Sequence, residues 1–366
     1  MMDRPTFEAR PLLPAIPVVD VRDGGPPQHA RQSAGQAHAL RNACLGFFPR
    51  AALPLTPALD WFSRRALERS RSPYVGEVAE IAAVLGLPGV WMLNASYQWG
   101  CTARACAEDG VPWLIRTLDW PFRGLGRYTE VARMRSAGGD FFNVTWPGYV
   151  GVLTATAPRR FAAALNQAPL RRRTRHRWLR PLDYAVNALA AASSAGRIPP
   201  DQLLRRVFET CANFAAARRL LETTPVARPA IYTLIGCATH ERCVIERTET
   251  DFVTREDEAC AANDWVPERP GWEGRIGMRR FLTSSFAEAA GYSRARRESL
   301  ATWNGSLSAG KFDWIREPVL NPYTRLAVAL CPGRGILRAA GYDVGNAPLP
   351  EPVTQLCEIN VPAPAA

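Results

Sequence analysis

Apolar residues recur at helical spacing along the first part of the chain, from about residue 31 to residue 100. The clearest case is SPYVGEVAEIAAVLGLP, in which Ser72 is a candidate N-cap, Pro73 suits the first turn and Gly86 is a candidate stop. Residues 1–30 are rich in proline and are predicted to be extended or disordered. We therefore expect a mostly helical N-terminal segment over residues 31–100.

The pattern changes at Cys101. From there, short apolar runs are broken by Gly, Pro and Asp, as expected for successive strands joined by tight turns. Helical stretches interrupt the strands at about 181–196, 200–222 and 277–310, and strands return after each of the last two. This order predicts an α+β fold in which sheets are stacked between helical layers, with one domain over residues 101–366.

The composition indicates a large core and a basic surface. The chain has 366 residues, is 47% hydrophobic and carries a formal net charge of +11, with Lys311 as its only lysine. We interpret the arginine excess as a generally basic surface, and we expect no nucleic acid as a partner. The densest run, RRRTRHRWLR at Arg171–Arg180, is a candidate contact for anionic lipid or an acidic partner, with a solvated loop as the alternative.

The cysteines and histidines do not form a recognisable metal or disulfide pattern. The nine cysteines are irregularly spaced without a CxxC pair, and the four histidines stand in no familiar motif, so we expect no metal and no cofactor. The N-terminal stretch contains acidic residues and prolines where a signal sequence needs an apolar run, and no stretch approaches the ~18 apolar residues of a membrane span. These features predict reduced thiols in a cytoplasmic protein.

The stretch around Cys101 is a candidate for covalent chemistry. Cys101 begins one predicted strand, Arg116 and Asp119 lie on or just after the next, and a turn at Asp109-Gly110 would pair the two strands. If the bond before the cysteine is cut, the freed α-amine, with a pKa of about 7.7 to 8.0, can act as general base for the thiol. Asp119 could then hold this amine, and Arg116 could lower the thiol pKa.

Simpler interpretations of the same residues stay open at this point. Cys101 alone would be a buried structural cysteine, and Arg116 and Asp119 alone would be a surface ion pair. Cys106, five residues further on, would face the opposite side of the strand, where we expect it to fill the core.

Several motifs follow one another from about residue 72 to residue 340. They are LNASY before Cys101-Thr102, AEDG and RTLD after it, YVGVLTATAPRRFAAALNQ (149–167), CANFAAARRLLETTPVARPAIYTLIG (211–236) and ACAANDWVPERPGWEGR (259–275). In this order they resemble the acid ceramidase and N-acylethanolamine acid amidase family, which belongs to the choloylglycine hydrolase class of Ntn hydrolases. The resemblance implies an αββα four-layer Ntn-hydrolase sandwich.

The resemblance also implies roles for individual residues. Cys101 would be the nucleophile, exposed by self-cleavage of the Gly100–Cys101 bond, with Arg116 and Asp119 beside it, and Asn263 would supply the oxyanion hole. The later arginine of the family would be Arg275, with its neighbours Arg279 and Arg280 as alternatives.

Three departures from the family pattern concern the substrate. Asn166 and Gln167 stand where the amidases carry acidic residues, so they would bind substrate by hydrogen bonds without a carboxylate. Asp264-Trp265 replaces the family's tyrosine after the asparagine, and the Arg171–Arg180 run replaces an aromatic-rich stretch.

The implied activity is hydrolysis of the C–N bond in small-molecule N-acyl amides with an apolar acyl chain, such as fatty acyl amides or ceramide-like compounds. Gly before Cys-Thr is also similar to isopenicillin N acyltransferase relatives, so acyl transfer is a second hypothesis. A third is a non-catalytic binding protein that keeps the fold.

Overall fold

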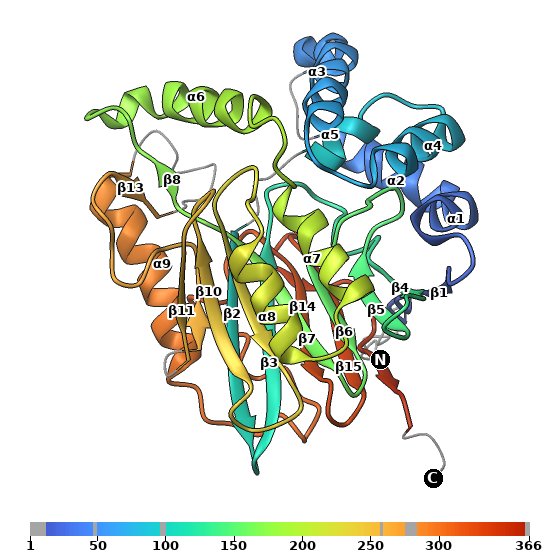
Figure 1. The fold of residues 1–366 in the computed structure, drawn as a ribbon, viewed down its shortest axis with the longest axis vertical. Helices are drawn as coiled ribbons and strands as arrows, with labels where there is room; N and C mark the ends of the chain where they lie inside the picture. The colour runs from blue at the N-terminus through green and yellow to red at the C-terminus, as the bar shows by residue number, and fades with distance from the viewer. Residues whose placement is uncertain (1–11, 47–49, 96–99, 257–258, 275–283, 363–366) are drawn as a thin grey trace, which may run out of the picture.

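The computed structural model describes residues 12–46, 50–95, 100–256, 259–274 and 284–362. Within these residues two large β-sheets lie face to face, with helices on the outer faces (Figure 1). The larger sheet is mostly antiparallel, and its strands in spatial order are β1 (Val18–Asp20), β4 (Glu130–Met134), β5 (Phe141–Thr145), β6 (Thr154–Ala157), β7 (Phe161–Gln167), β9 (Ala230–Ile235), β10 (Arg242–Arg247) and β11 (Phe252–Arg255).

The second sheet carries the candidate nucleophile. Its strands in spatial order are β12 (Cys260–Ala261), β2 (Gly100–Glu108), β3 (Val111–Asp119), β14 (Thr324–Cys331), β15 (Ile336–Asp343) and β16 (Glu351–Pro352), and β17 (Cys357–Asn360) also pairs with β15. A short ribbon joins β8 (Leu170–Arg171) and β13 (Trp272–Glu273) beside the sheets.

Helices form the remaining layers. In chain order they are α1 (Gly25–Gln32), α2 (Ala34–Leu45), the 3-10 turn η1 (Arg50–Leu55), α3 (Thr56–Arg69), α4 (Val75–Leu85), α5 (Val90–Ala95), η2 (Arg177–Leu179), α6 (Arg180–Ala192), α7 (Pro200–Thr210), α8 (Phe214–Thr223) and α9 (Phe286–Ala301). The helices α7 and α8 cover the larger sheet, and α9 covers β2 and β12 of the second sheet. The predicted αββα layering is therefore confirmed.

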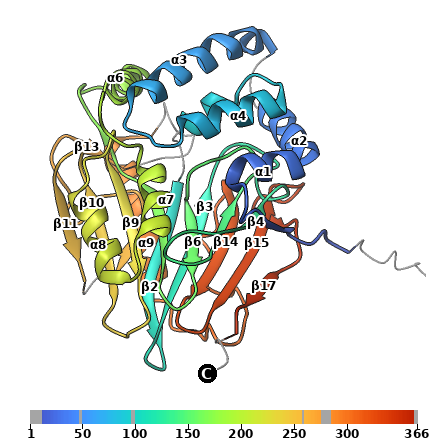
Figure 2. The same ribbon diagram turned by 45° about the vertical axis from the view of Figure 1, so that its right-hand side comes forward.

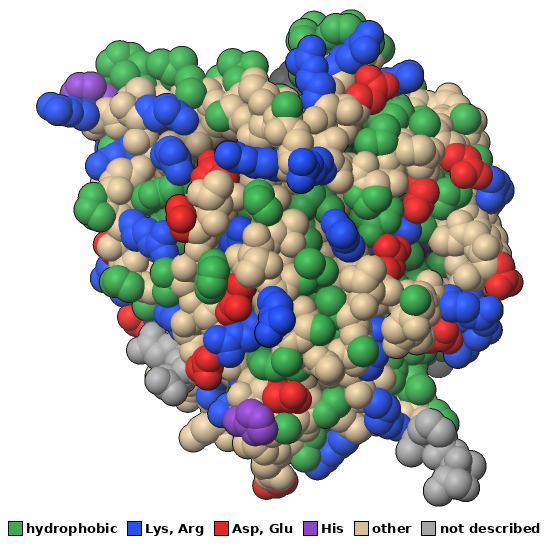
Figure 3. Space-filling model, in the orientation of Figure 1, with side chains coloured by type: hydrophobic (Ala, Val, Ile, Leu, Met, Phe, Trp, Pro, Cys, Tyr) green, Lys and Arg blue, Asp and Glu red, His purple; other side chains and the backbone are tan. Residues whose placement is uncertain are grey.

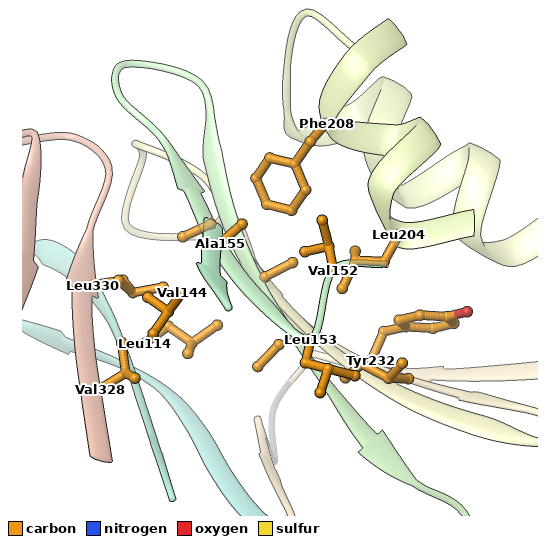
Figure 4. Packing of buried hydrophobic residues seen from close by; sticks show 14 of the residues in the cluster. Leu114, Val144, Val152, Leu153, Ala155, Leu204, Phe208, Tyr232, Val328 and Leu330 are labelled. Carbon is orange, nitrogen blue, oxygen red and sulfur yellow. The ribbon is translucent and has the colours of Figure 1, made fainter. Parts of the chain in front are cut away.

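The main core lies between the sheets and under α7. In Figure 4, Leu114 of β3 and Val328 and Leu330 of β14 point toward Val144 of β5, so the two inner faces interdigitate. On the other side of the larger sheet, Phe208 of α7 packs against Phe141 and Phe161, with ring centroids 5.4 and 4.9 Å away. Strands buried on both faces explain the near-continuous apolar runs of the sequence.

The N-terminal helices gather at one end of the two sheets (Figures 1 and 2). They share a separate apolar cluster that includes Tyr74, Val78 and Ile81, and β1 pairs in parallel with β4 at the edge of the larger sheet. The extended backbone expected up to residue 30 is wrong from Gly25 onward, because two prolines start α1 there, as prolines at a first helical turn can.

The helix predicted from Ser72 begins later than expected. It starts at Val75, and the Ser72 hydroxyl accepts a hydrogen bond from the Tyr74 backbone N–H before the helix. Its predicted end is confirmed, since Gly86 has a left-handed φ of 61° and closes the last turn. No helix in the described part of the chain has the length and apolar character needed to cross a membrane.

The hairpin of β2 and β3 forms as predicted. Asp109 and Gly110 have φ angles of 50° and 76°, which gives the two left-handed positions of a tight hairpin turn. In its register Cys101 lies opposite Leu118, and Gly100 lies opposite Asp119. The alternation of the strand places Cys101 in the core between the sheets and Cys106 in the cluster on the outer face, as expected.

Candidate active site around Cys101

Cys101 lies near the start of β2 and has no exposed surface. The Arg116 guanidinium of β3 donates a hydrogen bond from Nη2 to the Cys101 Sγ at 2.8 Å. The same guanidinium donates to the backbone oxygens of Leu153 at 2.6 Å and Leu165 at 3.0 Å, and to the hydroxyl of Thr154. These bonds to the facing sheet fix the arginine, so that its positive charge is held against the sulfur.

Opposing effects act on the thiol pKa. Burial raises the pKa of Cys101 above its usual value, and Arg116 acts in the opposite direction through its charge and its hydrogen bond. The nearby carboxylate of Asp119 raises the thiol pKa as well. The net effect is a raised pKa, so the buried site needs both its arginine and a base to generate a thiolate.

Arg296 of α9 is a central residue that the sequence analysis missed. Its Nη1 donates to the Cys101 carbonyl oxygen at 2.9 Å, to the Thr102 hydroxyl at 3.0 Å and to Asp119 Oδ2 at 3.1 Å. Its Nη2 donates to Asn263 Oδ1 at 2.8 Å. The arginine is almost completely buried, and it links the three predicted site residues Cys101, Asp119 and Asn263.

Asp119 does not contact the Cys101 nitrogen. Its Oδ2 accepts hydrogen bonds from Arg296 and, at 2.9 Å, from Asn321 Nδ2, while its Oδ1 accepts one from the Thr324 hydroxyl at 3.0 Å. The expectation that Asp119 lies at the Cys101 nitrogen is therefore wrong in this structure. The carboxylate orients Arg296, which in turn contacts the cysteine backbone.

Asn263 occupies the position next to the Cys101 nitrogen. The Cys101 N–H donates to Asn263 Oδ1 at 2.9 Å, and the Asn263 Nδ2 donates to the Gln167 carbonyl oxygen at 2.8 Å. The two donors that meet at Oδ1 fix the orientation of the amide. An amide nitrogen carries two hydrogens, and the described residues show an acceptor for one of them, the Gln167 carbonyl oxygen.

The two residues predicted to bind substrate lie beside Asn263. Asn166 is fully buried, and its Nδ2 donates to the backbone oxygens of Ala261 and Ala262 at 3.3 and 3.1 Å. Gln167 accepts the hydrogen bond from Asn263 through its backbone. Both residues therefore hold the segment that carries Asn263. Arg275 and its alternatives, Arg279 and Arg280, lie outside the described residues.

Gly100 precedes the nucleophile at a crowded position. A Cβ atom at this position would lie 3.2 Å from the Asp119 Cβ, which is closer than most such contacts. Upstream, the Asn94 amide ties α5 to the loop after β5, because it donates to the Gly148 carbonyl oxygen and accepts from the Val150 N–H. The Asn94 side chain therefore holds the end of α5 against this loop.

An apolar cavity of about 350 Å³ lies at the same end of β3. Its lining includes Leu40 of α2, Leu85 of α4, Met92 of α5 and, after β3, Trp120 and Phe122. Trp120 directly follows Asp119, so the cavity lies at the end of β3 that carries Asp119. Among the described residues, no group of histidine, cysteine and acidic side chains is arranged to hold a metal ion.

Comparison with known proteins gives consistent similarities. No family model matches the chain. The N-acylethanolamine-hydrolyzing acid amidases of Rattus norvegicus and Mus musculus are 27% and 26% identical to it over 183 residues, which is 48% of this chain and 47% of each relative. That of Cavia porcellus is 25% identical over 182 residues, or 48% of both chains. The chain thus spans about half the length of the curated relatives it matches.

Solved structures give weaker likenesses. The N-acylethanolamine-hydrolyzing acid amidase ortholog of Caenorhabditis elegans has a TM-score of 0.45 at 17% identity and covers 64% of this chain and 93% of its own. A mutant of the conjugated bile acid hydrolase from Clostridium perfringens has a TM-score of 0.42 at 10% identity, covering 71% and 92%. In sequence, this chain resembles the N-acylethanolamine-hydrolyzing acid amidases over about half its length.

Proposed function

We propose that this chain is a cysteine amidohydrolase of the N-terminal nucleophile type, which cuts its own Gly100–Cys101 bond and then hydrolyses N-acyl amides. One observation carries the proposal. The Cys101 sulfur lies 2.8 Å from Arg116 Nη2, and the Cys101 nitrogen, which the cut would free, lies 2.9 Å from Asn263 Oδ1. Both reacting atoms of such a nucleophile therefore have a polar partner already in place.

In the proposed self-cleavage, the Cys101 sulfur attacks the carbonyl carbon of Gly100. The C–N bond of this peptide breaks, its nitrogen takes up a proton and becomes the amine of Cys101, and a thioester joins Gly100 to the sulfur. Water then hydrolyses the thioester and leaves a Gly100 carboxylate and a free thiol. Arg296 supports this step, because it holds the Cys101 carbonyl oxygen in place.

In the proposed hydrolysis, the Cys101 thiol gives its proton to its own α-amine and attacks the amide carbonyl of the substrate. The second amide hydrogen of Asn263 stabilises the oxyanion. The protonated amine then gives its proton to the leaving nitrogen, and water releases the acid from the thioester. Asp119 and Arg296 act as positioning residues, since they hold Asn263 and the Cys101 backbone.

The proposed substrate is an N-acyl amide with an apolar acyl chain. The relatives are named for hydrolysing N-acylethanolamines, and the apolar cavity beside Trp120 offers a place for a hydrocarbon chain. The helices α2, α4 and α5 of the N-terminal segment form part of the cavity wall, so the cavity depends on this segment. Replacing Met92 with Trp should therefore lower kcat/KM for long-chain amides more than for short-chain amides.

The N-terminal segment, residues 31–100, would stay bound after the cut as a separate chain on the domain formed by residues 101–366. The Ser33 hydroxyl, just before α2, donates to Glu130 Oε2 of β4 at 2.8 Å, and Arg205 of α7 contacts both carboxylate oxygens of Glu77 at 2.6 and 2.9 Å. These contacts cross the cut without depending on the chain connection.

We further propose that the Arg171–Arg180 run, with the neighbouring helices α3 and α6, contacts an anionic lipid surface. Trp61 and Phe62 of α3 are 53% and 64% exposed, and Trp178 and Leu189 near and on α6 are both 66% exposed. In Figure 3 these helices carry hydrophobic side chains beside arginines along one edge of the molecule. Apolar side chains flanked by arginine are typical of lipid interfaces. Binding to anionic vesicles should fall in a Trp61→Ser, Phe62→Ser variant, and binding unchanged from the wild type would contradict this role.

The thiols fit a reducing compartment. All nine cysteines are free, including those that lie within the core. We propose a cytoplasmic location on this ground, which fractionation of the native protein would test.

The proposed function is tested by the intact mass of the denatured protein. Wild type and Cys106→Ala should give two fragments that meet at Gly100 and Cys101, whereas Cys101→Ala should give one uncut chain. Purified wild type should also release free acid from an acyl amide, and Cys101→Ala should not. A wild type that stays uncut across a pH series, and is inactive, would leave the cysteine a structural role.

Product analysis with an added amine separates hydrolysis from acyl transfer. Hydrolysis predicts free acid as the main product at all amine concentrations. A new amide that replaces the acid as the amine increases would show an acyltransferase.

A further inference from the structure

The outer face of β2 lines a second, polar cavity. This cavity of about 510 Å³ lies between β2, β12, the first residue of β10 and the last turns of α9. It is on the opposite side of β2 from Cys101, because the side chains of Cys101 and Cys106 point to opposite faces of the strand. No step of the proposed hydrolysis uses it.

Positive charge dominates the described lining of this cavity. Arg104 of β2, Arg242 of β10 and Arg297 of α9 contribute three guanidinium groups, and Glu298 contributes one carboxylate. The two thiols that also line the cavity add no charge near neutral pH. Burial raises the pKa of Cys106 and raises that of Cys260 to about 12.

Two of these arginines are anchored by part of their guanidinium groups. Arg104 donates from Nη1 to the carbonyl oxygens of Leu300 and Trp303, at 3.0 and 2.6 Å, and so binds the end of α9. Arg297 donates from Nε to Asp264 Oδ2 at 3.2 Å. A guanidinium carries five N–H groups, so both arginines keep donors beyond these bonds.

The guanidinium group of Arg242, unlike those of Arg104 and Arg297, has no such anchoring hydrogen bond among the described residues. Its guanidinium makes no hydrogen bond or ion pair with any residue that the structure describes, and its Nε is buried without a partner. Its charge acts on the Cys106 thiol, which places it at the cavity. A buried donor without an acceptor is unfavourable, and an anionic ligand would supply the missing acceptor.

We propose that this cavity binds a small oxyanion, inorganic phosphate or a phosphomonoester, through Arg104, Arg242 and Arg297. A phosphate group presents several acceptor oxygens, which planar guanidinium groups contact in pairs. The bound group bridges β2, β10 and α9, three elements that otherwise meet around an open space. The proposal concerns binding alone and does not depend on the proposed hydrolase activity.

The cavity is coupled to the candidate active site through α9. Arg297 lines the cavity, and its neighbour Arg296 contacts the Cys101 carbonyl oxygen and the Asp119 carboxylate. A phosphate that holds Arg297 and Arg104 therefore holds α9 against β2. Hydrogen exchange of the backbone amides of α9 should slow when phosphate is added, while exchange in α8 should not change.

The test measures phosphate binding by titration calorimetry at constant ionic strength, with chloride as the balancing anion. Wild type should bind inorganic phosphate, and Arg242→Met should bind it at least tenfold more weakly. Arg219→Met, which removes an exposed arginine of α8, should bind like the wild type. Glu298→Gln removes the carboxylate from the cavity lining and should bind phosphate severalfold more tightly than the wild type. A gain in affinity cannot result from misfolding of the variant.

Glycerol 3-phosphate in place of phosphate distinguishes the two sources of the oxyanion. Tighter binding of the ester indicates an organic phosphate as the ligand, and equal binding indicates inorganic phosphate; both support the site. Equal phosphate affinity in wild type and Arg242→Met, or no binding beyond that of chloride, would overturn the proposal. Asp257 and Glu258, which precede the lining residue Ala259, provide a further check: binding that occurs only in Asp257→Asn, Glu258→Gln would also overturn it.

Discussion

Cysteine and arginine occur together on both sides of β2, but the arginines make different contacts on the two sides. Arg116 on the inner face, together with Arg296, which reaches the Cys101 backbone from α9, surrounds Cys101, and the two arginines donate hydrogen bonds to the facing sheet, to α9 and to the cysteine itself. On the outer face, the arginines beside Cys106 line an open cavity and keep unused donors. The comparison teaches that a cysteine among arginines is not itself a site. The closed inner arrangement can fix a nucleophile, whereas the open outer one can admit a ligand.

Substitution of the adjacent residues Arg296 and Arg297 of α9 tests this comparison most directly. Arg296→Met removes the link between Cys101, Asp119 and Asn263, so we expect self-cleavage and amide hydrolysis to fall by about 10³-fold or more. Arg297→Met removes a hydrogen bond to Asp264 but none to Cys101, Asp119 or Asn263, and should keep both rates within about threefold of the wild type. Fragment formation over time, measured by mass, and initial rates of acid release check both variants.

A control is needed because Arg296 pairs with a buried carboxylate. Losing one partner of a buried pair costs about 3–5 kcal/mol, so Arg296→Met could lose activity by unfolding. Asp119→Asn combined with Arg296→Met removes the unpaired charge and should recover part of the stability. If cleavage also recovers in this double variant, Arg296 serves stability alone and our assignment is wrong.

Arg116 tests the electrostatic part of the inner site. Arg116→Met removes the group that lowers the Cys101 pKa, so the thiol pKa should rise and alkylation of Cys101 in the cleaved protein should need a higher pH. We expect a loss of about 10²-fold in kcat/KM near neutral pH. Arg116→Lys keeps the charge but loses the planar guanidinium group, so its kcat/KM should lie between those of the wild type and Arg116→Met. An unchanged alkylation profile in Arg116→Met would show that the guanidinium does not act on the sulfur.

A smaller effect is expected at the residue before the nucleophile. Gly100→Ala places a methyl group 3.2 Å from the Asp119 Cβ, which shifts the strand slightly and should slow self-cleavage about tenfold. Gly76→Ala in α4 is the matched control, because nothing lies within 4 Å of the added methyl group. It should leave cleavage unchanged and stabilise the chain by about 0.5–1 kcal/mol. Equal cleavage rates in both variants would show that close packing of residue 100 against Asp119 does not affect self-cleavage.

Local signals explain which parts of the inner site could be predicted from the sequence. Asp109-Gly110 marks the turn, and the two-residue period of a strand then places Cys101 inward and Cys106 outward. The same hairpin brings Arg116 to the sulfur. Asn263 was found only by its motif, because its position depends on β12 pairing with β2.

Long-range packing explains what could not be predicted. Arg296 lies 195 residues from Cys101 and is one of three arginines in the run SRARR of α9. Helical spacing shows that these arginines point in different directions, but not which direction meets β2. Two further partners of Asp119 have no motif: Asn321 lies in the segment before β14, and Thr324 is the first residue of that strand. The sequence therefore predicted part of the cluster around Cys101 and missed Arg296, which links its members.

The weakest predicted effect concerns the thiols of the outer face at alkaline pH. Burial raises the pKa of Cys260 to about 12 from its usual 9.0, so the folded protein keeps this proton longer than the unfolded chain does. The resulting stability is fully present below pH 9 and is lost as the pH rises toward 12, at up to about 1.4 kcal/mol per pH unit. Cys260→Ala should therefore lose stability less steeply between pH 9 and 11 in urea unfolding. Cys237→Ala, at an exposed cysteine, should change this slope less.

Equal slopes in the wild type and Cys260→Ala would mean that the Cys260 thiol is already ionised or hydrated in the folded protein. Such a thiol would add negative charge to the cavity, so this measurement of stability also tests whether the outer face is positive enough to hold an anion.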